Sequence, residues 1–190
     1  MKHDSRRQEG ETGRQTIFTR LRGNAGLIVA VLAIALLTIF LRAVNLRAAY
    51  DIFLDEITYL FLAESVAENL GVRLHGETFY LHPPLFFYLE GAFVRLFSPA
   101  GEIVDRVYAV RALNVALAVD SGAVVFLLGR AAAGPLAGLL AALIYALDPL
   151  SIRLGSRNML EVAAIFWVLV GLLVIMPLPG RDRPERTALW

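Results

Sequence analysis

The sequence contains no cysteine, which excludes disulfide bonds and thiolate metal sites. The net charge is +1, and the basic residues form no patch of the kind that binds nucleic acid. Charge is also missing from two long stretches, 23–41 and 162–180, each of nineteen residues. At 1.5 Å per residue, each stretch is long enough as a helix to cross a hydrocarbon core of about 30 Å.

Two further apolar runs accompany these stretches. Residues 131–147 continue past Asp148 to residue 152, and residues 112–129 are interrupted only by Asp120. The sequence therefore predicts an all-α, polytopic membrane protein with spans near 24–41, 112–129, 135–152 and 162–179. These spans belong to one transmembrane module at 23–180.

The distribution of arginine orients this module. Residues 1–22 are polar and rich in arginine, which predicts a disordered cytoplasmic tail. The apolar run after it is too long for a signal-peptide core and lacks a small-residue cleavage site, so it is predicted to be an uncleaved anchor. With four spans, Arg130 and a second tail at 181–190 are also cytoplasmic, as the positive-inside rule requires. We therefore expect a multi-pass protein of the plasma membrane.

The segment 83–97 is not predicted to span, because it is short and contains Glu90 and Arg95. An external loop then covers 42–110, with nine acidic residues. Apolar residues at helical spacing predict an amphipathic interfacial helix that ends at Gly71: Ile57, Leu60, Ala63, Ala67 and Leu70. A second interfacial helix is predicted to begin at Pro83 and Pro84.

Acidic residues near the outer ends of the spans are the first candidates for chemistry. Asp55 and Glu56 precede the first interfacial helix, where a carboxylate could accept a proton from an incoming hydroxyl group. The alternative is that Asp55 caps the helix. Glu161 opens the fourth span on the same side of the membrane, and its alternative role is an ion pair with Arg157.

Two basic residues are candidates for phosphate binding. His82 precedes the paired prolines, where it either starts a helix or contacts a phosphate or a metal ion; one histidine does not make a metal site. Arg111 opens the second span and could clamp a phosphate by paired hydrogen bonds, or simply extend toward the interface. No metal ligand set is predicted, and a divalent-metal requirement is left open.

Asp120 differs from the other carboxylates because it falls near mid-bilayer. A carboxylate at that depth is expensive unless it faces the interior of a helix bundle, so it marks either a functional site or a hydrogen-bonded packing position between helices. The pair Asp148 and Pro149 is predicted to mark the outer end of the third span.

Several motifs follow one another in a recognisable order: Asp55-Glu56-x-x-Tyr59, His82-Pro83-Pro84-Leu85-x-x-Tyr88, Arg111-Ala112-Leu113-Asn114 and Arg157-Asn158-Met159-Leu160-Glu161. This order resembles the N-terminal part of GT-C membrane glycosyltransferases of the protein mannosyltransferase and aminoarabinose-transferase kind. The resemblance covers residues 27–175. It implies a hexosyl- or pentosyltransferase that takes a sugar from a polyprenyl-phosphate donor to a protein, lipid or glycan acceptor on the extracytoplasmic face.

The resemblance also implies roles for individual residues. Asp55 would be the general base and Glu56 would assist it. His82 and Arg111 would bind the donor phosphate, and three residues would line the cavity: Tyr59, Arg157 and Glu161. Members of this family carry many more spans, so the chain is expected to be a truncated gene product, a fragment, or half of a split enzyme that needs a complementing membrane subunit. The alternative is a non-catalytic membrane subunit or scaffold derived from such an enzyme.

Overall fold

The computed structural model describes residues 25–44, 46–47 and 51–176. This part of the chain is mostly helical, as predicted. An N-terminal helix, Ala25–Ala43, is followed by α2 (Leu54–Ala67), α3 (Leu85–Phe97), α4 (Ile103–Ala133), α5 (Pro135–Leu147), α6 (Pro149–Gly155) and α7 (Leu160–Ile175). A short antiparallel hairpin, β1 (Arg73–Leu74) with β2 (Glu77–Thr78), is an addition that the sequence does not predict. The predicted tails lie outside the described residues.

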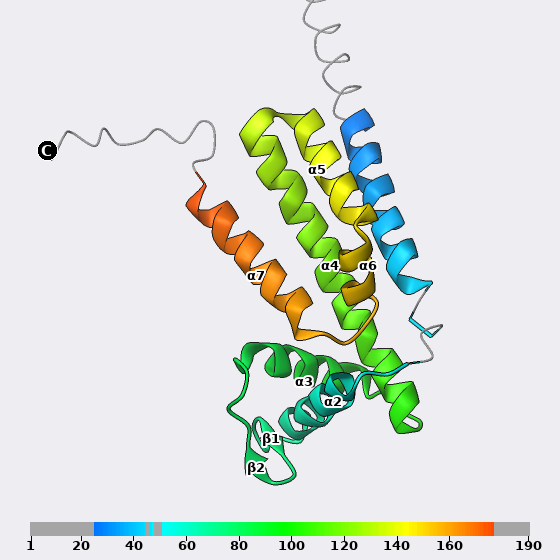
Figure 1. The fold of residues 1–190 in the computed structure, drawn as a ribbon, viewed down its shortest axis with the longest axis vertical. Coiled ribbons are helices and arrows are strands. Elements are labelled where there is room, and N and C mark those ends of the chain that lie inside the picture. The colour runs from blue at the N-terminus through cyan, green and yellow to red at the C-terminus, as the bar shows by residue number, and fades with distance from the viewer. Residues whose placement is uncertain (1–24, 45, 48–50, 177–190) are drawn as a thin grey trace, which may run out of the picture.

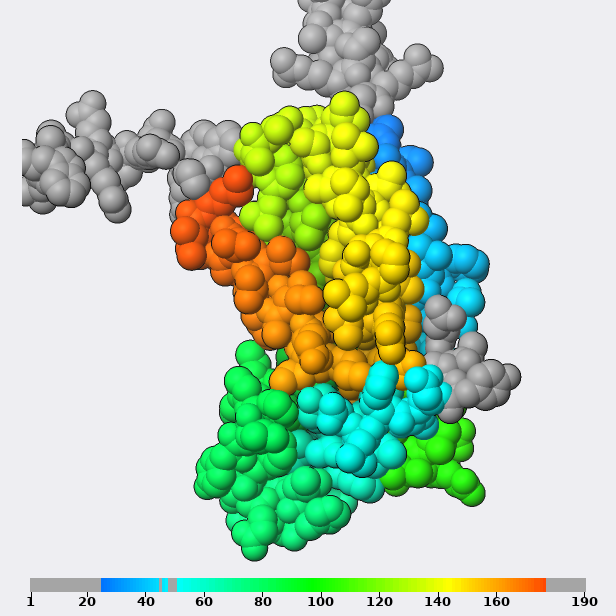
Figure 2. Space-filling model, in the orientation of Figure 1, coloured from blue at the N-terminus to red at the C-terminus, as the bar shows by residue number. Residues whose placement is uncertain are grey.

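The molecule has two parts (Figure 1). The N-terminal helix, α4, α5 and α7 run lengthwise, whereas α2, α3 and the hairpin form a lobe at one end. In the space-filling view the lobe lies directly against the beginning of α7 (Figure 2). The segment before α2 and the connection from α6 to α7 therefore meet at the same end of the molecule. Most of the predicted site residues lie in or next to these segments: Asp55, Glu56 and Tyr59 in α2, Arg157 in the connection and Glu161 at the beginning of α7.

Two described helices are long and apolar enough to cross a membrane, the N-terminal helix and α4. The pair α5 and α6 adds a third candidate if it is counted as one span, bent by 64°. The break confirms that the third apolar run loosens at Asp148, whose carboxylate accepts a hydrogen bond from the Ser151 N–H at 2.7 Å and so caps α6. Helix α7 has 16 residues, short of the ~20 of a full span. The fourth span therefore stays a prediction.

The bounds of α4 and α2 differ from those expected. Helix α4 begins at Ile103, because the Asp105 carboxylate accepts the Glu102 N–H at 3.3 Å and starts the helix before the apolar run does. The connection before it is accordingly shorter than 42–110. Helix α2 ends at Ala67, and Asn69, with φ +64°, turns the chain before Gly71. Leu70 lies beyond the helix and is exposed, so it does not belong to the expected apolar face.

Close helix contacts hold each part together. In the lobe, α2 crosses α3 at Gly91, where an added Cβ would meet the Val66 side chain at 2.6 Å. Among the long helices, a Cβ on Gly138 of α5 would lie 2.6 Å from the Phe126 carbonyl oxygen of α4. Both glycines are therefore needed for close approach. The core of the molecule lies where α2, α3, α4 and α7 meet and includes Leu62, Phe87, Leu117, Val162 and Ala163.

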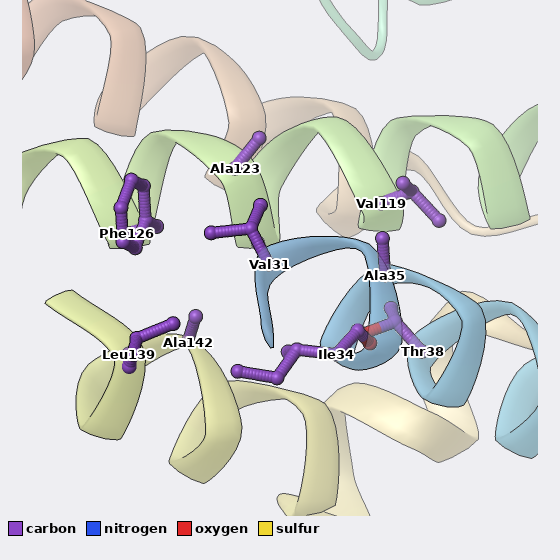
Figure 3. A pocket seen from close by; sticks show the side chains of 10 residues that line it. Val31, Ile34, Ala35, Thr38, Val119, Ala123, Phe126, Leu139 and Ala142 are labelled. Carbon is purple, nitrogen blue, oxygen red and sulfur yellow. The ribbon is translucent and has the colours of Figure 1, made fainter. Parts of the chain in front are cut away.

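The N-terminal helix is joined to α5 by a buried arginine. Arg42 donates hydrogen bonds to the carbonyl oxygens of Ala146 at 3.3 Å and Tyr145 at 3.4 Å, and its guanidinium lies over the Tyr145 ring at 5.3 Å. Elsewhere the helix contributes to a cavity of about 50 Å³ with α4 and α5 (Figure 3). The lining is almost entirely apolar, with Thr38 as its polar exception. None of the predicted site residues lines this cavity.

Candidate functional site

The candidate carboxylates Asp55 and Glu56 are adjacent in sequence, but their side chains leave the helix in different directions. Helix α2 begins at Leu54, so Asp55 and Glu56 occupy its first turn, and Phe53 rather than Asp55 takes the capping position. Asp55 is exposed and forms no hydrogen bond or ion pair with the described part of the chain. Glu56 is completely buried. Successive helix residues are about 100° apart, which separates the two side chains.

Glu56 is the centre of a buried polar network. Arg111 of α4 binds it through two nitrogens, Nε to Oε2 at 2.7 Å and Nη2 to Oε1 at 2.9 Å. The backbone N–H of Asn158 donates to Oε2 at 3.0 Å, and that of Phe53 donates to Oε1 at 3.2 Å. A paired guanidinium and several N–H donors are what a carboxylate needs in order to stay charged when it is buried.

Arg157 extends the network toward the surface. Its Nη2 donates to the Asp51 carboxylate at 2.9 Å, its Nη1 donates to the Asp51 carbonyl oxygen at 2.9 Å, and Nη1 lies 3.5 Å from Glu56 Oε1. Glu161 therefore does not form the ion pair with Arg157 that the spacing suggested. The network thus contains two guanidinium groups, of Arg111 and Arg157, and two carboxylates, of Glu56 and Asp51, so its charges balance.

These contacts assign different roles from those expected for Glu56 and Arg111. All three Arg111 nitrogens donate hydrogen bonds, the third to the Leu46 carbonyl oxygen at 2.8 Å, and the side chain has no exposed surface. In this arrangement both side chains are completely buried. Both hold the lobe on α4 instead, a role that spacing along the chain does not reveal.

Two asparagines that the sequence analysis gave no role complete the connection between α6 and α7. Asn114 of α4 donates to the carbonyl oxygens of Arg157 at 2.7 Å and Met159 at 2.9 Å. The side chain of Asn158 donates to Glu90 of α3. Asn114 stands in otherwise apolar sequence, a signal that could have indicated buried hydrogen bonding, whereas Asn158 follows Ser156 and Arg157 and gives no such signal.

Glu90 is the second fully buried carboxyl group of the lobe. Its Oε1 accepts the Asn158 hydrogen bond, while Oε2 has no hydrogen-bond partner among the described residues. Burial raises the pKa of Glu90 to about 8, and the nearby charges of Glu64 and Glu56 act in the same direction. Glu90 is thus predominantly a neutral acid at pH 7, which leaves the charge balance around Glu56 undisturbed.

A different group of predicted residues gathers around the Tyr59 side chain. The centroid of the Tyr59 ring lies 6.0 Å from that of the His82 ring, with the rings edge to face, and 5.5 Å from that of the Phe87 ring. Burial raises the pKa of Tyr59 to about 12, with further contributions from the charges of Asp55, Glu161 and Glu90. The hydroxyl group consequently stays protonated and can donate a hydrogen bond.

The remaining two carboxylates, Asp55 and Glu161, lie near enough to Tyr59 for their charges to raise its pKa. The bond between Glu56 and the Asn158 N–H joins the beginning of α2 to the chain just before α7. Asp55 is adjacent to one end of this bond, and Glu161 is three residues beyond the other. Both carboxylates are exposed, and neither has a hydrogen-bond partner in the described ranges. Two residues from distant parts of the sequence thus share one surface.

A groove of about 690 Å³ runs beside this surface. It lies between the turn after α2 and the beginning of α3, and its lining includes Arg73, Tyr80, His82 and Tyr88. Tyr80 is 87% exposed and Tyr88 is 52% exposed. The groove is within the size range of small-molecule sites, and His82 belongs both to the groove and to the surroundings of Tyr59.

The surface around Tyr59 contains carboxylates but no recognisable ligand cluster for a metal ion. Within 25–44, 46–47 and 51–176, no three His, Asp or Glu side chains are grouped so that they could hold one. Asp120 lies elsewhere, exposed on the surface of α4 and not between packed helices. The packing role considered for it is therefore not fulfilled by the helices described.

The chain matches no protein-family model, no curated protein and no solved structure.

Proposed function

We propose that this chain is a membrane glycosyltransferase, or the part of one that carries its external catalytic surface. The sugar comes from a polyprenyl-phosphate donor and passes to a hydroxyl acceptor on the extracytoplasmic face. The observation that carries this proposal is the pair of exposed, unpartnered carboxylates, Asp55 and Glu161, beside the protonated Tyr59 hydroxyl group.

In the proposed reaction the acceptor oxygen attacks the anomeric carbon of the sugar. A new carbon–oxygen bond forms there, and the bond from that carbon to the phosphate oxygen breaks. The acceptor proton moves to Asp55, and polyprenyl phosphate leaves with the electron pair. The protein's contribution is positioning and charge stabilisation, because polyprenyl phosphate is already a good leaving group.

The remaining residues around Asp55 have supporting roles in this proposal. Glu161 and the Tyr59 hydroxyl group orient the sugar by hydrogen bonds. His82, whose ring centroid lies 6.0 Å from that of Tyr59, contacts the donor phosphate, because Arg111 is occupied by Glu56. The groove beside His82 holds the acceptor, with Tyr80 and Tyr88 as its exposed aromatic surface.

The location of the donor follows from the apolar helices in this proposal. The lobe lies on the extracytoplasmic side, since the arginine-rich tails and Arg130 belong on the cytoplasmic side. A polyprenyl chain in the bilayer then presents its phosphate at the level where the lobe meets the beginning of α7. This level is where Asp55 and Glu161 lie.

The test is sugar transfer by the full chain in phospholipid vesicles. Wild-type protein is supplied with polyprenyl-phosphate hexoses and pentoses that carry a radiolabelled sugar, and with a hydroxyl acceptor (a serine-containing peptide, a lipid or a glycan). Transfer of the label to the acceptor and release of polyprenyl phosphate are measured. We expect Asp55→Asn to lower the rate by about 100-fold or more, because a general base contributes about 10² to 10⁴. Glu77→Gln, an exposed carboxylate on the hairpin, is the matched control and should leave the rate unchanged.

A second candidate function is a non-catalytic membrane subunit. It is favoured by the burial of Glu56 and Arg111, which turns two predicted site residues into structural ones. Under it, the wild-type chain releases no polyprenyl phosphate from any donor. Equal rates for wild type and Asp55→Asn would likewise remove Asp55 from the reaction.

A further inference from the structure

One face of α4 is left uncovered by the described helices. Four exposed residues form a stripe along it at helical spacing: Ala112, Ala116, Asp120 and Leu127. The residues that pack against α7, such as Leu117, and against α5, such as Phe126, point in other directions, and Ala123 lines the cavity shared with the N-terminal helix. Three of the four stripe residues are apolar, and two of them are alanines.

Asp120 lies in the middle of this stripe and of the helix. It is the eighteenth of the 31 residues of α4, about 26 Å from the beginning and about 20 Å from the end. No hydrogen bond or ion pair joins it to any residue that the structure describes. The residues one turn away, including Ala116 and Val124, have no side-chain donor to offer.

The neighbouring polar groups of α4 contrast with Asp120. Ser121 is buried and donates to the Leu117 carbonyl oxygen at 2.8 Å, and Asn114 is buried and donates twice. Asp120 alone among these three faces outward. If α4 crosses the bilayer, this orientation directs a carboxylate at mid-depth toward hydrocarbon, where such a group is costly without a partner.

We infer that this face binds a membrane helix of a different polypeptide, one that carries a basic side chain at mid-depth. Ala116 and Ala112, one and two turns before Asp120, allow the backbones to approach closely, which is the usual basis of helix contacts in membranes. The basic side chain supplies the opposite charge and the hydrogen-bond donors that Asp120 lacks. A second copy of this chain, related by a two-fold axis along the membrane normal, would oppose Asp120 with Asp120 and repel it.

This inference is independent of sugar transfer. It requires only that α4 crosses the membrane, and it applies equally to a transferase and to a non-catalytic subunit. A negative result for donor cleavage would therefore leave it standing, and a negative result for helix binding would leave the reaction proposed for Asp55 untouched.

The test uses synthetic membrane helices as partners. The full chain, labelled through a single cysteine at Glu77→Cys, is placed in phosphatidylcholine vesicles; the absence of native cysteine makes this label unique. Leucine-rich helices with alanines at intervals of four carry one central Lys, Leu or Glu together with an acceptor dye. Energy transfer at increasing peptide-to-lipid ratios then gives the relative affinities.

We expect the Lys helix to bind at least tenfold more tightly than the Leu helix, and the Glu helix to bind least. Asp120→Leu should remove the preference for Lys, and Asp120→Lys should transfer it to the Glu helix. Ala116→Leu should weaken binding of the Lys helix by blocking close approach, while the variant still resists alkaline extraction from the vesicles.

Equal binding of the Lys and Leu helices to the wild-type chain would overturn the inference. So would energy transfer between two wild-type copies that depends on Asp120, since the partner would then be the chain itself. Preservation of the Lys preference in Asp120→Leu would show that another residue supplies the charge, and this also would overturn it.

Discussion

The carboxylates at the two faces of α2 differ in almost every physical respect although they are neighbours in sequence. Glu56 has no exposed surface and accepts hydrogen bonds from Arg111, Asn158 and Phe53. Asp55 is exposed and accepts none from the described residues. The buried group has its hydrogen-bonding capacity used within the protein, whereas the exposed group is free to bind something else.

This difference separates structural from chemical roles within one motif. A buried charge that loses its partner is strongly destabilising, so the Glu56 network should govern whether the lobe stays attached to α4. An exposed charge contributes little to folding, so substitutions at Asp55 or Glu161 should affect reactivity without unfolding the chain. Substitutions should therefore destabilise the fold less as the side chain they change becomes more exposed.

The largest effect is expected from Arg111→Met, which removes the paired hydrogen bonds to Glu56. The carboxylate would retain two backbone N–H donors and the more distant Arg157, at 3.5 Å. We expect the free energy of unfolding to fall by about 3–5 kcal/mol, the usual result when one partner of a buried pair is removed. Thermal unfolding in detergent micelles, followed by circular dichroism, measures this change.

The control is Arg95→Met, at an exposed arginine of α3 that donates to Asn69. It should shift the unfolding temperature only slightly, because an exposed polar contact contributes little. Similar shifts for the two variants would show that Arg111 is not a structural residue, and would return it to consideration as a phosphate ligand.

A smaller and pH-dependent effect is expected from Glu90→Gln. Because burial raises the pKa of Glu90 to about 8 in the folded chain, the folded state retains a proton that the unfolded state loses near pH 4.5. The stability associated with this proton is complete below about pH 4.5 and is lost as the pH rises through 8. Glutamine cannot ionise, and its amide oxygen can still accept from Asn158.

We therefore expect the wild-type chain to lose on the order of 2–3 kcal/mol more than Glu90→Gln between pH 5 and pH 8. Unfolding temperatures of both proteins at several pH values test this, and Glu77→Gln serves as an exposed control. Parallel stability curves for wild type and Glu90→Gln would mean that Glu90 is already ionised in the folded chain.

The helices could be predicted from the sequence because the length and period of an apolar run are local properties. The runs at 24–41 and 112–129 correspond to the two helices long enough to span, and Asp148 with Pro149 marks the observed bend. The beginning of α4 was misplaced because its first turns contain charged residues, Asp105 and Arg106, and so lie outside the uncharged run. Residues 103–111 belong to the helix because of the cap at Glu102 and because Val107 and Val110 are buried against Leu60 of α2.

The candidate site was predictable only in part. Helical geometry implies that Asp55 and Glu56 face apart, but it does not say which of the two is buried. That choice depends on Arg111 and Arg157, which are 55 and 101 residues away from Glu56. The roles of Asn114 and Asn158 depend on contacts of similar sequence separation, so residue spacing within each motif does not reveal them.

The smallest effect is expected from Asp51→Asn, which tests whether burial is what separates the two kinds of carboxylate. Asp51 lies closer to Arg157, at 2.9 Å, than Glu56 does, at 3.5 Å, but the Asp51 side chain is 68% exposed. Its hydrogen bond with Arg157 lowers the pKa of Asp51, so any contribution to stability would be present above its ordinary pKa and lost as the pH falls. Water and salt screen such a pair, and Arg157 keeps its bond to the Asp51 carbonyl oxygen in the variant. We therefore expect unfolding temperatures at pH 7 that agree with wild type within experimental scatter. A loss comparable to that of Arg111→Met would show that contact with arginine, and not burial, determines which carboxylates hold the fold.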